Sequence, residues 1–188
     1  TYVRGAGRPP LAAASARRLA TGLAMQYWRD TTTEPVFRMH WPVRFQLERR
    51  ALRDGDISPT RTGTVAVPTL APADTTELFG LRFTGYVRVP RTGVYRFTAR
   101  HDDGAALWIG DREVFWAMGQ SPRPVESWGE IALQAGVHPV TLTYFQAYGP
   151  MLLELDVEGA GLARRRMDAT WWRRDAAPAT PPARRPAR

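Results

Sequence analysis

The segment Gly80–Val114 constrains the fold of this chain most strongly, because its apolar residues recur at every second position. The alternation runs through residues 81–89 and again through residues 95–99, which is the pattern of β-strands with one buried face. A Pro-Arg-Thr-Gly sequence at 90–93 separates the two runs. Proline presets a turn and glycine tolerates positive φ, so the segment predicts a β-hairpin.

The predicted hairpin ends at an acidic corner, where His101-Asp102-Asp103-Gly104 is followed by an apolar run at residues 106–109. Two adjacent carboxylates at a tight corner supply two of the roughly six to eight oxygens that a calcium ion takes. Alternatively, Asp102 caps the turn through its backbone, and Asp103-Gly104 provides the turn geometry. The sequence alone leaves both interpretations of the pair open.

Several pieces of the chain, taken in order, resemble the protective-antigen type β-barrel domain family. The central pieces are Gly93-Val94-Tyr95-Arg96-Phe97, Asp102-Asp103-Gly104, Leu107-Trp108-Ile109-Gly110 and Val114. Residues 22–28 look like the family's opening strand, residues 131–140 resemble its late strand-turn-strand, and residues 151–157 look like its closing strand. The resemblance covers about residues 22–158 and implies a β-barrel fold.

The expected fold class is therefore all-β, an antiparallel barrel or sandwich of about ten strands with irregular basic extensions at both ends. We expect an N-terminal basic arm at 1–21, the β-domain at 22–158 and a basic Pro/Arg-rich C-terminal extension at 159–188. Alternation also predicts a strand at 43–47. Residues 11–20 are rich in alanine, leucine and arginine, which favours a short helix.

The net charge of +8 raises the question of a nucleic-acid partner, and the location of the charge bears on it. Residues 1–20 hold four arginines and no acidic residue, and residues 159–188 hold eight arginines and two acidic residues. The remaining residues 21–158 hold fourteen arginines and sixteen acidic residues, a charge of −2. This balance argues against a domain built to bind polyanions, so we expect no nucleic-acid partner. The arms suit an acidic partner or an anionic membrane surface.

The resemblance implies a ligand for the acidic corner. In adhesin and lectin members of the family, a matching aspartate pair holds calcium, and the calcium contacts sugar hydroxyls. By this resemblance Asp102 and Asp103 would bind both carbohydrate and metal. Those members complete the site with an asparagine and a nearby loop, and this sequence contains no asparagine. The remaining ligands would be carbonyls, water, Gln120 or Gln146, so we expect no required cofactor, with calcium as the candidate metal ion.

Two aromatic residues in candidate loops, Trp116 and Tyr148, are the expected carbohydrate-stacking groups. An aromatic face offers a large area to the apolar side of a sugar ring. The alternative is that these rings anchor the core or the loops, because a domain with seven tryptophans must bury several.

The sequence offers no recognisable catalytic constellation, so we expect no enzymatic activity. It contains no cysteine, which excludes disulfides, thiolate metal sites and a cysteine nucleophile. The Gly-x-Ser-x-Gly, His-Glu-x-x-His and phosphate-loop motifs are missing. His101 lies next to the carboxylate pair, but no nucleophile at a fixed spacing accompanies it.

The C-terminal extension contains a basic aromatic cluster that suits docking on a partner, because tryptophan and arginine are enriched at interface hot spots. Its members are Arg164, Arg165, Arg166, Trp171, Trp172, Arg173 and Arg174. The alternative is that the two tryptophans pack onto the β-domain as a lid.

Two functions remain open from the sequence. The first, implied by the resemblance, is a non-catalytic, extracytoplasmic module for carbohydrate recognition or protein docking. The second is a structural or accessory subunit whose β-domain and basic arms brace a larger, membrane-associated complex. The missing asparagine and the composition of the arms favour the second function. The carbohydrate binding of other members of the resembled family favours the first.

Overall fold

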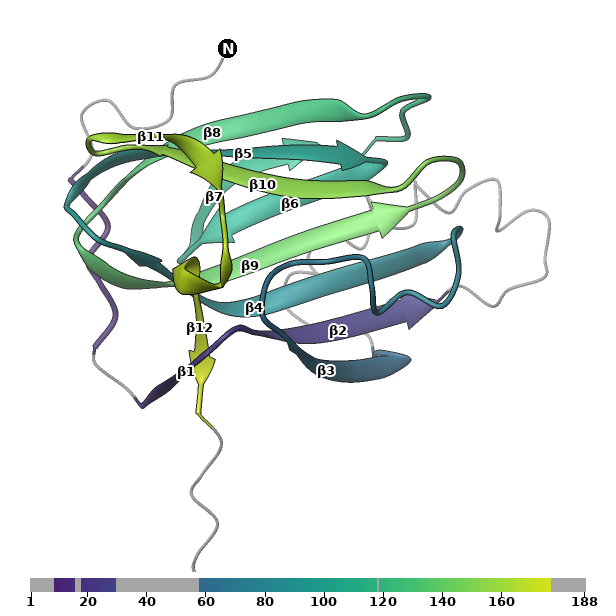
Figure 1. Ribbon diagram of the computed structural model, residues 1–188, viewed down its shortest axis with the longest axis horizontal. Helices are drawn as coiled ribbons and strands as arrows, with labels where there is room; N and C mark the ends of the chain where they lie inside the picture. The colour runs from purple at the N-terminus through teal and green to yellow at the C-terminus, as the bar shows by residue number, and fades with distance from the viewer. Residues whose placement is uncertain (1–8, 16–17, 30–57, 118, 177–188) are drawn as a thin grey trace, which may run out of the picture.

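The computed structural model describes residues 9–15, 18–29, 58–117 and 119–176, which form a two-layered β-sandwich (Figure 1). These residues make the following elements: β1 (Leu19–Thr21), β2 (Leu23–Arg29), β3 (Arg61–Val65), β4 (Phe79–Val89), β5 (Gly93–Asp102), β6 (Gly104–Ile109), β7 (Arg112–Ala117), β8 (Val125–Leu133), β9 (Gly136–Gln146), β10 (Leu152–Gly159), β11 (Leu162–Arg166), the 3₁₀ helix η1 (Ala169–Trp171) and β12 (Trp172–Asp175). Among the described residues, no helix has the length and apolar character needed to cross a membrane.

The strands divide between two antiparallel sheets. The larger sheet has the order β1-β12-β4-β9-β6-β7, with β2 pairing with both β4 and β3, and the smaller sheet has the order β11-β10-β5-β8. Figure 1 shows the smaller sheet stacked over the larger one. The expected all-β antiparallel class is confirmed, and the described strands form the sandwich, not the closed barrel. The strand expected at 43–47 lies outside the described residues.

The central segment forms two strands as predicted, but these strands do not pair with each other. β4 pairs with β2, β9 and β12 in the larger sheet, whereas β5 pairs with β8 and β10 in the smaller sheet. The turn at 90–92 therefore crosses between the sheets, and the predicted hairpin is wrong. Alternation reports which face of a strand is buried. Because both strands face the same core, it carries no information about their pairing partners.

The core between the sheets holds the inward-facing side chains of these two strands. Five of them are at most 1% exposed: Leu81, Phe83, Val87, Tyr95 and Phe97. Burying a side chain of this size is worth roughly 1.5–3 kcal/mol, so the positions that predicted the strands also predicted the core. Gly85 interrupts the row with a φ of +155°, and a Cβ there would lie 2.3 Å from the main-chain oxygen of Arg173. Glycine is therefore required where β12 passes β4.

The fold continues beyond residue 158, where the sequence predicted its end. Ala160 and Gly161 have φ values of 52° and 81°, and β11 follows them and pairs with β10. β12 then pairs with β4 and with β1. Ala160 and Gly161 supply the left-handed conformations of the hairpin turn between β10 and β11. The expected extension thus contributes strands as far as Asp175.

Residues 9–15 lie along the end of the sandwich and do not begin a helix. Leu11 donates its N–H to the carbonyl oxygen of Ala132 at 2.8 Å and accepts a hydrogen bond from the N–H of Gln134 at 3.0 Å. The short helix predicted for residues 11–20 is absent from the described part of that range. Pairing with the end of β8 satisfies the backbone groups that a helix would otherwise satisfy internally.

Candidate functional site

The two carboxylates of the acidic corner lie at one end of the sandwich, where the chain passes from β5 in the smaller sheet to β6 in the larger sheet. Asp102 is 0% exposed and Asp103 is 2% exposed, and the peptide bond between them is cis. The Asp103 carboxylate accepts hydrogen bonds from the N–H of Ser121 at 3.0 Å and from the N–H of Ala147 at 2.7 Å. Asp103 thereby ties the loop after β7 and the loop after β9 to the corner.

The Asp102 carboxylate is in a different state, because both of its Oδ atoms are buried and neither has a hydrogen-bond partner. Only its main-chain oxygen is engaged, by the hydroxyl of Tyr144. Burial, followed by the nearby charge of Asp103, raises the pKa of Asp102. A buried carboxylate without partners is costly while it is charged. Asp102 therefore requires either a proton or a cation.

The buried ring of His101 is hydrogen-bonded to the main chain of the acidic corner. Its Nδ1 lies 2.7 Å from the main-chain oxygen of Asp103, and its Nε2 lies 3.0 Å from Oγ of Ser127. A carbonyl oxygen only accepts, so Nδ1 carries the proton and the Ser127 hydroxyl donates to Nε2. The ring is 0% exposed, and this burial lowers the pKa of His101. The histidine is thus a neutral support for the corner, with both ring nitrogens already occupied.

Gln146, expected as a metal ligand, is fully committed to its own surroundings. Its Oε1 lies 2.7 Å from the Tyr144 hydroxyl, which shares its single proton between this oxygen and the main-chain oxygen of Asp102. Its Nε2 donates to the carbonyl oxygens of Gly149 at 3.3 Å and Pro150 at 3.1 Å. The side chain is 0% exposed. Gln146 therefore shapes the loop after β9. Gln120, the other expected ligand, is exposed on the loop after β7.

An apolar rim surrounds the acidic corner. Among the described residues the exposed large hydrophobic side chains are Val94, Val125, Tyr148 and Met151, with exposed fractions of 36% to 47%. The last three lie at the corner end, because the β8 residue Val125 pairs with His101 and the β10 residue after Met151 pairs with Asp102. Tyr148 follows Ala147, whose N–H binds Asp103. The expected stacking residue Tyr148 is thus brought to the carboxylates.

Trp116 lies on the outer face of the larger sheet, in β7, where it pairs with the β6 residue Ala106. Its ring packs edge-on against Trp108 with centroids 5.9 Å apart, within a second apolar cluster that also contains Trp28, Ala106 and Phe145. These positions alternate with neighbours that face the main core, so they occupy the opposite side of the sheet. Trp116 is half-buried there. The packing of Trp116 against Trp108 agrees with the alternative interpretation, in which this ring anchors the protein interior instead of stacking on a sugar.

The residues present at the corner fit a bound cation. Asp102 offers two buried carboxylate oxygens without other partners, and each Asp103 oxygen accepts one bond and keeps a lone pair. Calcium takes roughly six to eight oxygens. The described residues contain no cluster of three or more histidine, cysteine, aspartate or glutamate side chains. Main-chain carbonyls and water would therefore complete the coordination.

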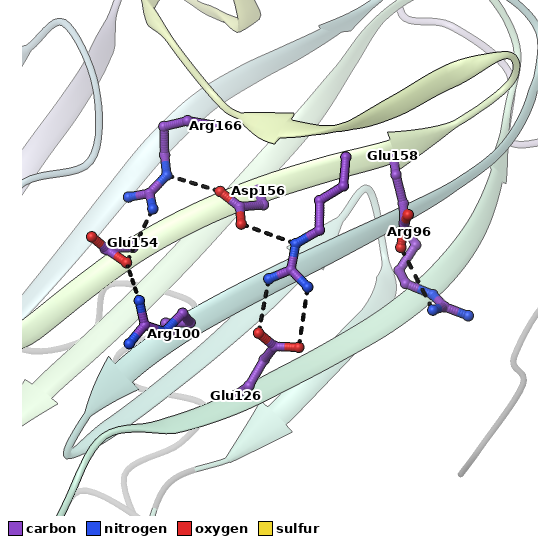
Figure 2. Close-up of polar contacts among 8 residues, drawn as sticks. Arg96, Arg100, Glu126, Glu154, Asp156, Glu158 and Arg166 are labelled. Carbon is purple, nitrogen blue, oxygen red and sulfur yellow. Dashed lines mark hydrogen bonds and ion pairs between the residues drawn. The ribbon is translucent and has the colours of Figure 1, made fainter.

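The expected docking cluster is divided between a buried part, the two tryptophans, and an exposed part, the three arginines of β11. Trp171 is 7% exposed and Trp172 is 1% exposed, and both belong to the main core. Arg164 and Arg166 form ion pairs across the outer face of the smaller sheet, with closest partners at 2.8 Å. Figure 2 shows Arg166 between Glu154 and Asp156. The tryptophans therefore pack onto the sandwich, as in the alternative interpretation of this segment.

The remaining arginines of the expected docking cluster also have partners within the domain. Arg165 lies 3.8 Å from Asp168, and Nη1 of Arg173 donates to the carbonyl oxygen of Trp172 at 2.7 Å. Nη1 of Arg174 donates to the carbonyl oxygen of Asp175 at 3.3 Å. The arginines of the C-terminal strands thus turn toward their own chain.

A sequence model of the PA14 domain matches residues 19–171. This chain belongs to the PA14 domain family. The match begins with β1 and reaches η1, so it includes β11, which lies beyond residue 158, and ends just before β12. No curated protein sequence matches the chain.

Solved structures share the fold of this PA14 domain at low identity. An anti-sigma factor domain-containing protein matches with a TM-score of 0.64 and 17% identity over 91% of this chain and 51% of its own, so this chain spans about half of it. The Epa9A adhesin domain from Candida glabrata, solved in complex with Galb1-3GlcNAc, has a TM-score of 0.62 and 13% identity over 89% and 95% of the two chains. A PA14 sugar-binding domain from an RTX adhesin has a TM-score of 0.57 and 15% identity over 82% and 98%.

The sequence pointed to Asp102, Asp103 and Tyr148 but not to the residues that support them. His101 was considered only as a base, and the Tyr144 hydroxyl sits in a strand whose pattern marks it as core. Ser121 binds the corner from a loop that carries no motif. A glutamine at 146, at the end of an apolar strand, is the one signal that a buried polar network was present.

Proposed function

We propose that this PA14 domain is a non-catalytic carbohydrate-binding module whose site is the Asp102–Asp103 corner. The observation that carries the proposal is the Asp102 carboxylate, which is buried and has neither oxygen hydrogen-bonded. A stable fold gains nothing from such a group. A site that binds a cation and a polar ligand requires one.

Asp102 and Asp103 are the residues that would hold a calcium ion, in an arrangement already fixed by the polypeptide. When bound, calcium supplies a hard centre that attracts sugar hydroxyl oxygens. Asp103 keeps the loops after β7 and β9 in place through Ser121 and Ala147. His101 supports the main chain of Asp103 at 2.7 Å, so the carboxylates are positioned before any ligand arrives.

Tyr148 supplies the apolar contact of the proposed site. Its ring is 41% exposed and belongs to the loop that Gln146 holds through the carbonyl oxygens of Gly149 and Pro150. A ring fixed in this way offers its face to the apolar side of a sugar with little loss of freedom. Met151 and Val125 extend the apolar rim. Hydroxyl groups would then meet the carboxylates while ring carbons meet the rim.

The adhesin PA14 domains named above support this function at the level of the fold. Fold alone does not establish a ligand, and the corner geometry makes the proposal specific to this chain. We further propose that the module acts outside the cytoplasm, where adhesins meet glycans. The buried tryptophans Trp171 and Trp172 lend no support to the alternative function as a bracing subunit.

The proposal is tested by glycan-array binding of the full chain with calcium and with a chelator. We expect binding that requires calcium and is lost in Asp102→Asn, which keeps the side-chain size and removes the charge. Asp111→Asn is the matched control, because Asp111 is an exposed aspartate in the turn between β6 and β7. Tyr148→Ala should weaken binding by roughly tenfold, as expected for loss of a stacking ring. Binding that survives both the chelator and Asp102→Asn would overturn the proposal.

A further inference from the structure

The loop between β7 and β8 carries an exposed arginine, Arg123, close to the acidic corner. It forms no ion pair with any residue in the described part of the chain, in contrast to the arginines on the nearby strands. Arg100 lies 3.1 Å from Glu154, and Arg164 lies 2.8 Å from Glu126. A guanidinium without an acidic neighbour is therefore a distinct feature of this end of the sandwich.

The main chain around Arg123 is held to the corner from both sides. On one side, the N–H of Ser121 donates to Oδ1 of Asp103 at 3.0 Å, and the hydroxyl of Ser121 donates to the carbonyl oxygen of Arg123 at 2.6 Å. On the other side, Val125 begins β8 and pairs with His101. Arg123 is thus two residues from each anchor, on a loop that is hydrogen-bonded to the Asp103 carboxylate.

Two prolines restrict the loop further. Pro122 precedes Arg123 and Pro124 follows it, and proline locks its own φ while biasing the residue before it toward extended backbone. The backbone of Arg123 therefore has few conformations to lose when a ligand binds. This restriction lowers the entropic cost of using the guanidinium in recognition.

The charges at the corner favour an anionic group on the ligand. Two carboxylates and one divalent cation leave no net charge, and a protonated Asp102 would reduce the charge in a similar way. Arg123, whose main chain is tied to the corner through Ser121, then remains as a positive charge without an acidic partner among the described residues. A guanidinium presents a planar fork of donors that matches a carboxylate or a sulfate with two parallel hydrogen bonds.

We propose that the saccharide bound at this corner is acidic, carrying a carboxylate or sulfate group that Arg123 binds. The inference rests on the proposed carbohydrate-binding function and names its ligand class. Hydroxyl groups of the sugar meet the Asp102–Asp103 side, and the anionic group points toward the loop after β7. Arg123 acts as a specificity-determining residue, because a neutral sugar leaves its guanidinium without a partner.

The experiment compares matched neutral and acidic saccharides by isothermal titration on the full chain in calcium. Galactose-terminated against galacturonate-terminated oligosaccharides form one pair, and unsulfated against sulfated galactosides form the other, which separates carboxylate from sulfate recognition. We expect the preferred acidic member to bind about tenfold tighter or more, as for one charge-assisted bidentate contact. The preference should decrease at high salt, because the contact is exposed.

Variants of the loop locate the preference. Arg123→Gln should bring the acidic-to-neutral ratio of affinities to about one, and Arg123→Lys should keep part of the preference, since it retains charge but loses the fork. Arg91→Gln is the matched control, because Arg91 is also exposed and follows a proline, in the turn at the opposite end of β5. Melting temperatures of all variants verify that the fold is intact.

Each outcome decides between the two proposals. Equal binding of neutral and acidic sugars, unaffected by Arg123→Gln, would refute the acidic ligand and leave the carbohydrate-binding function in place if Asp102→Asn abolishes both. An acidic preference that Arg123→Gln leaves unchanged also refutes the role of Arg123. No saccharide binding of either kind by the unaltered chain would remove the proposed function and the inference together.

Discussion

The outer face of the smaller sheet and the Asp102–Asp103 corner use similar charged side chains in opposite ways. On the face, arginines and carboxylates form ion pairs across β5, β8, β10 and β11, and Figure 2 shows part of this network. Arg96, Arg100, Arg164 and Arg166 each have an acidic partner within 3.1 Å. The residues of this network are Arg96, Arg100, Glu126, Glu130, Glu154, Asp156, Glu158, Arg164 and Arg166. At the corner, no hydrogen-bond donor among the described residues reaches the Asp102 carboxylate, whose charged neighbour is the like charge of Asp103.

The difference separates a structural use of charge from a functional use. Partly exposed ion pairs are modest contributors to stability, and pairing keeps the basic strand β11 compatible with its acidic neighbours. A buried carboxylate without a partner lowers stability, so it is retained only where a ligand compensates. Pairing, more than residue type, therefore indicates which charges of this domain are available for binding.

The largest effect is expected for Asp103→Ala, which would leave the buried N–H of Ala147 and the half-buried N–H of Ser121 without an acceptor. We expect the free energy of unfolding to fall by about 3 kcal/mol, since each unsatisfied donor costs roughly 1–3 kcal/mol. Urea denaturation measures the change. Asp111→Ala, at an exposed turn position, is the control and should change the free energy of unfolding by less than about 0.5 kcal/mol. A loss no greater than that of the control would show that the corner does not support the loops.

Asp102→Asn should have the opposite sign. In calcium-free buffer at mildly alkaline pH, we expect the variant to be more stable than the unaltered chain by about 1–2 kcal/mol, because a buried charge is removed. Saturating calcium should stabilise only the unaltered chain, by mass action, and should reduce or reverse the difference. Urea denaturation with and without calcium measures both values. A variant that is less stable under both conditions would show that Asp102 has a structural partner.

The pH dependence of stability should differ in sign between the two regions. The pKa of Asp102 is raised from its ordinary 3.8, so its contribution is fully present below 3.8 and is lost as pH rises through the folded pKa. Hydrogen bonds from Arg164 and Arg166 lower the pKa values of Glu126 and Glu154 from 4.5. Their contribution is present above 4.5 and is lost as pH falls through the folded pKa values.

Melting temperatures in calcium-free buffer across the acidic to neutral range measure these two trends. Subtracting the profile of Asp102→Asn from that of the unaltered chain isolates the corner, and the difference should become less favourable as pH rises. The acid-side loss should persist in the variant, because the ion-pair network is intact. Identical profiles for the two proteins would contradict the raised pKa of Asp102.

The smallest effect is expected on the paired face. Glu154 accepts from Arg100 at 3.1 Å and lies 3.0 Å from Arg166, and its side chain is 29% exposed. Glu154→Gln should lower the free energy of unfolding by about 0.5–1 kcal/mol, with a smaller difference at high salt. Urea denaturation at two salt concentrations checks this. A loss above about 2 kcal/mol would show that these ion pairs contribute to stability as strongly as buried ones, and the contrast between this face and the corner would fail.

Sequence reasoning predicted the strands best where one face of each is buried. Leu81 and Phe83 reach 0% exposure as the alternation required. The same pattern led to the wrong prediction that β4 and β5 pair as a hairpin. Both strands bury one face in the same core, but they belong to different sheets. Sequence reasoning also placed the end of the domain too early. A glycine such as Gly161 can follow the last strand of a domain, and it can equally form the turn of a hairpin, as it does between β10 and β11. Trp171 and Trp172 looked like an exposed cluster, because short-range sequence carries no information about packing against a distant core.

For the site, the sequence by itself determined the chemical groups: two adjacent carboxylates after an alternating strand, an aromatic loop residue and an arginine between prolines. It also determined the strands, because a period of two depends only on local backbone geometry. Only the tertiary structure decided that each Asp103 oxygen accepts from one main-chain amide and that no donor reaches the Asp102 carboxylate. Those partners come from loops eighteen and forty-four residues away, and solvation of a carboxylate depends on what surrounds it in space, not along the chain.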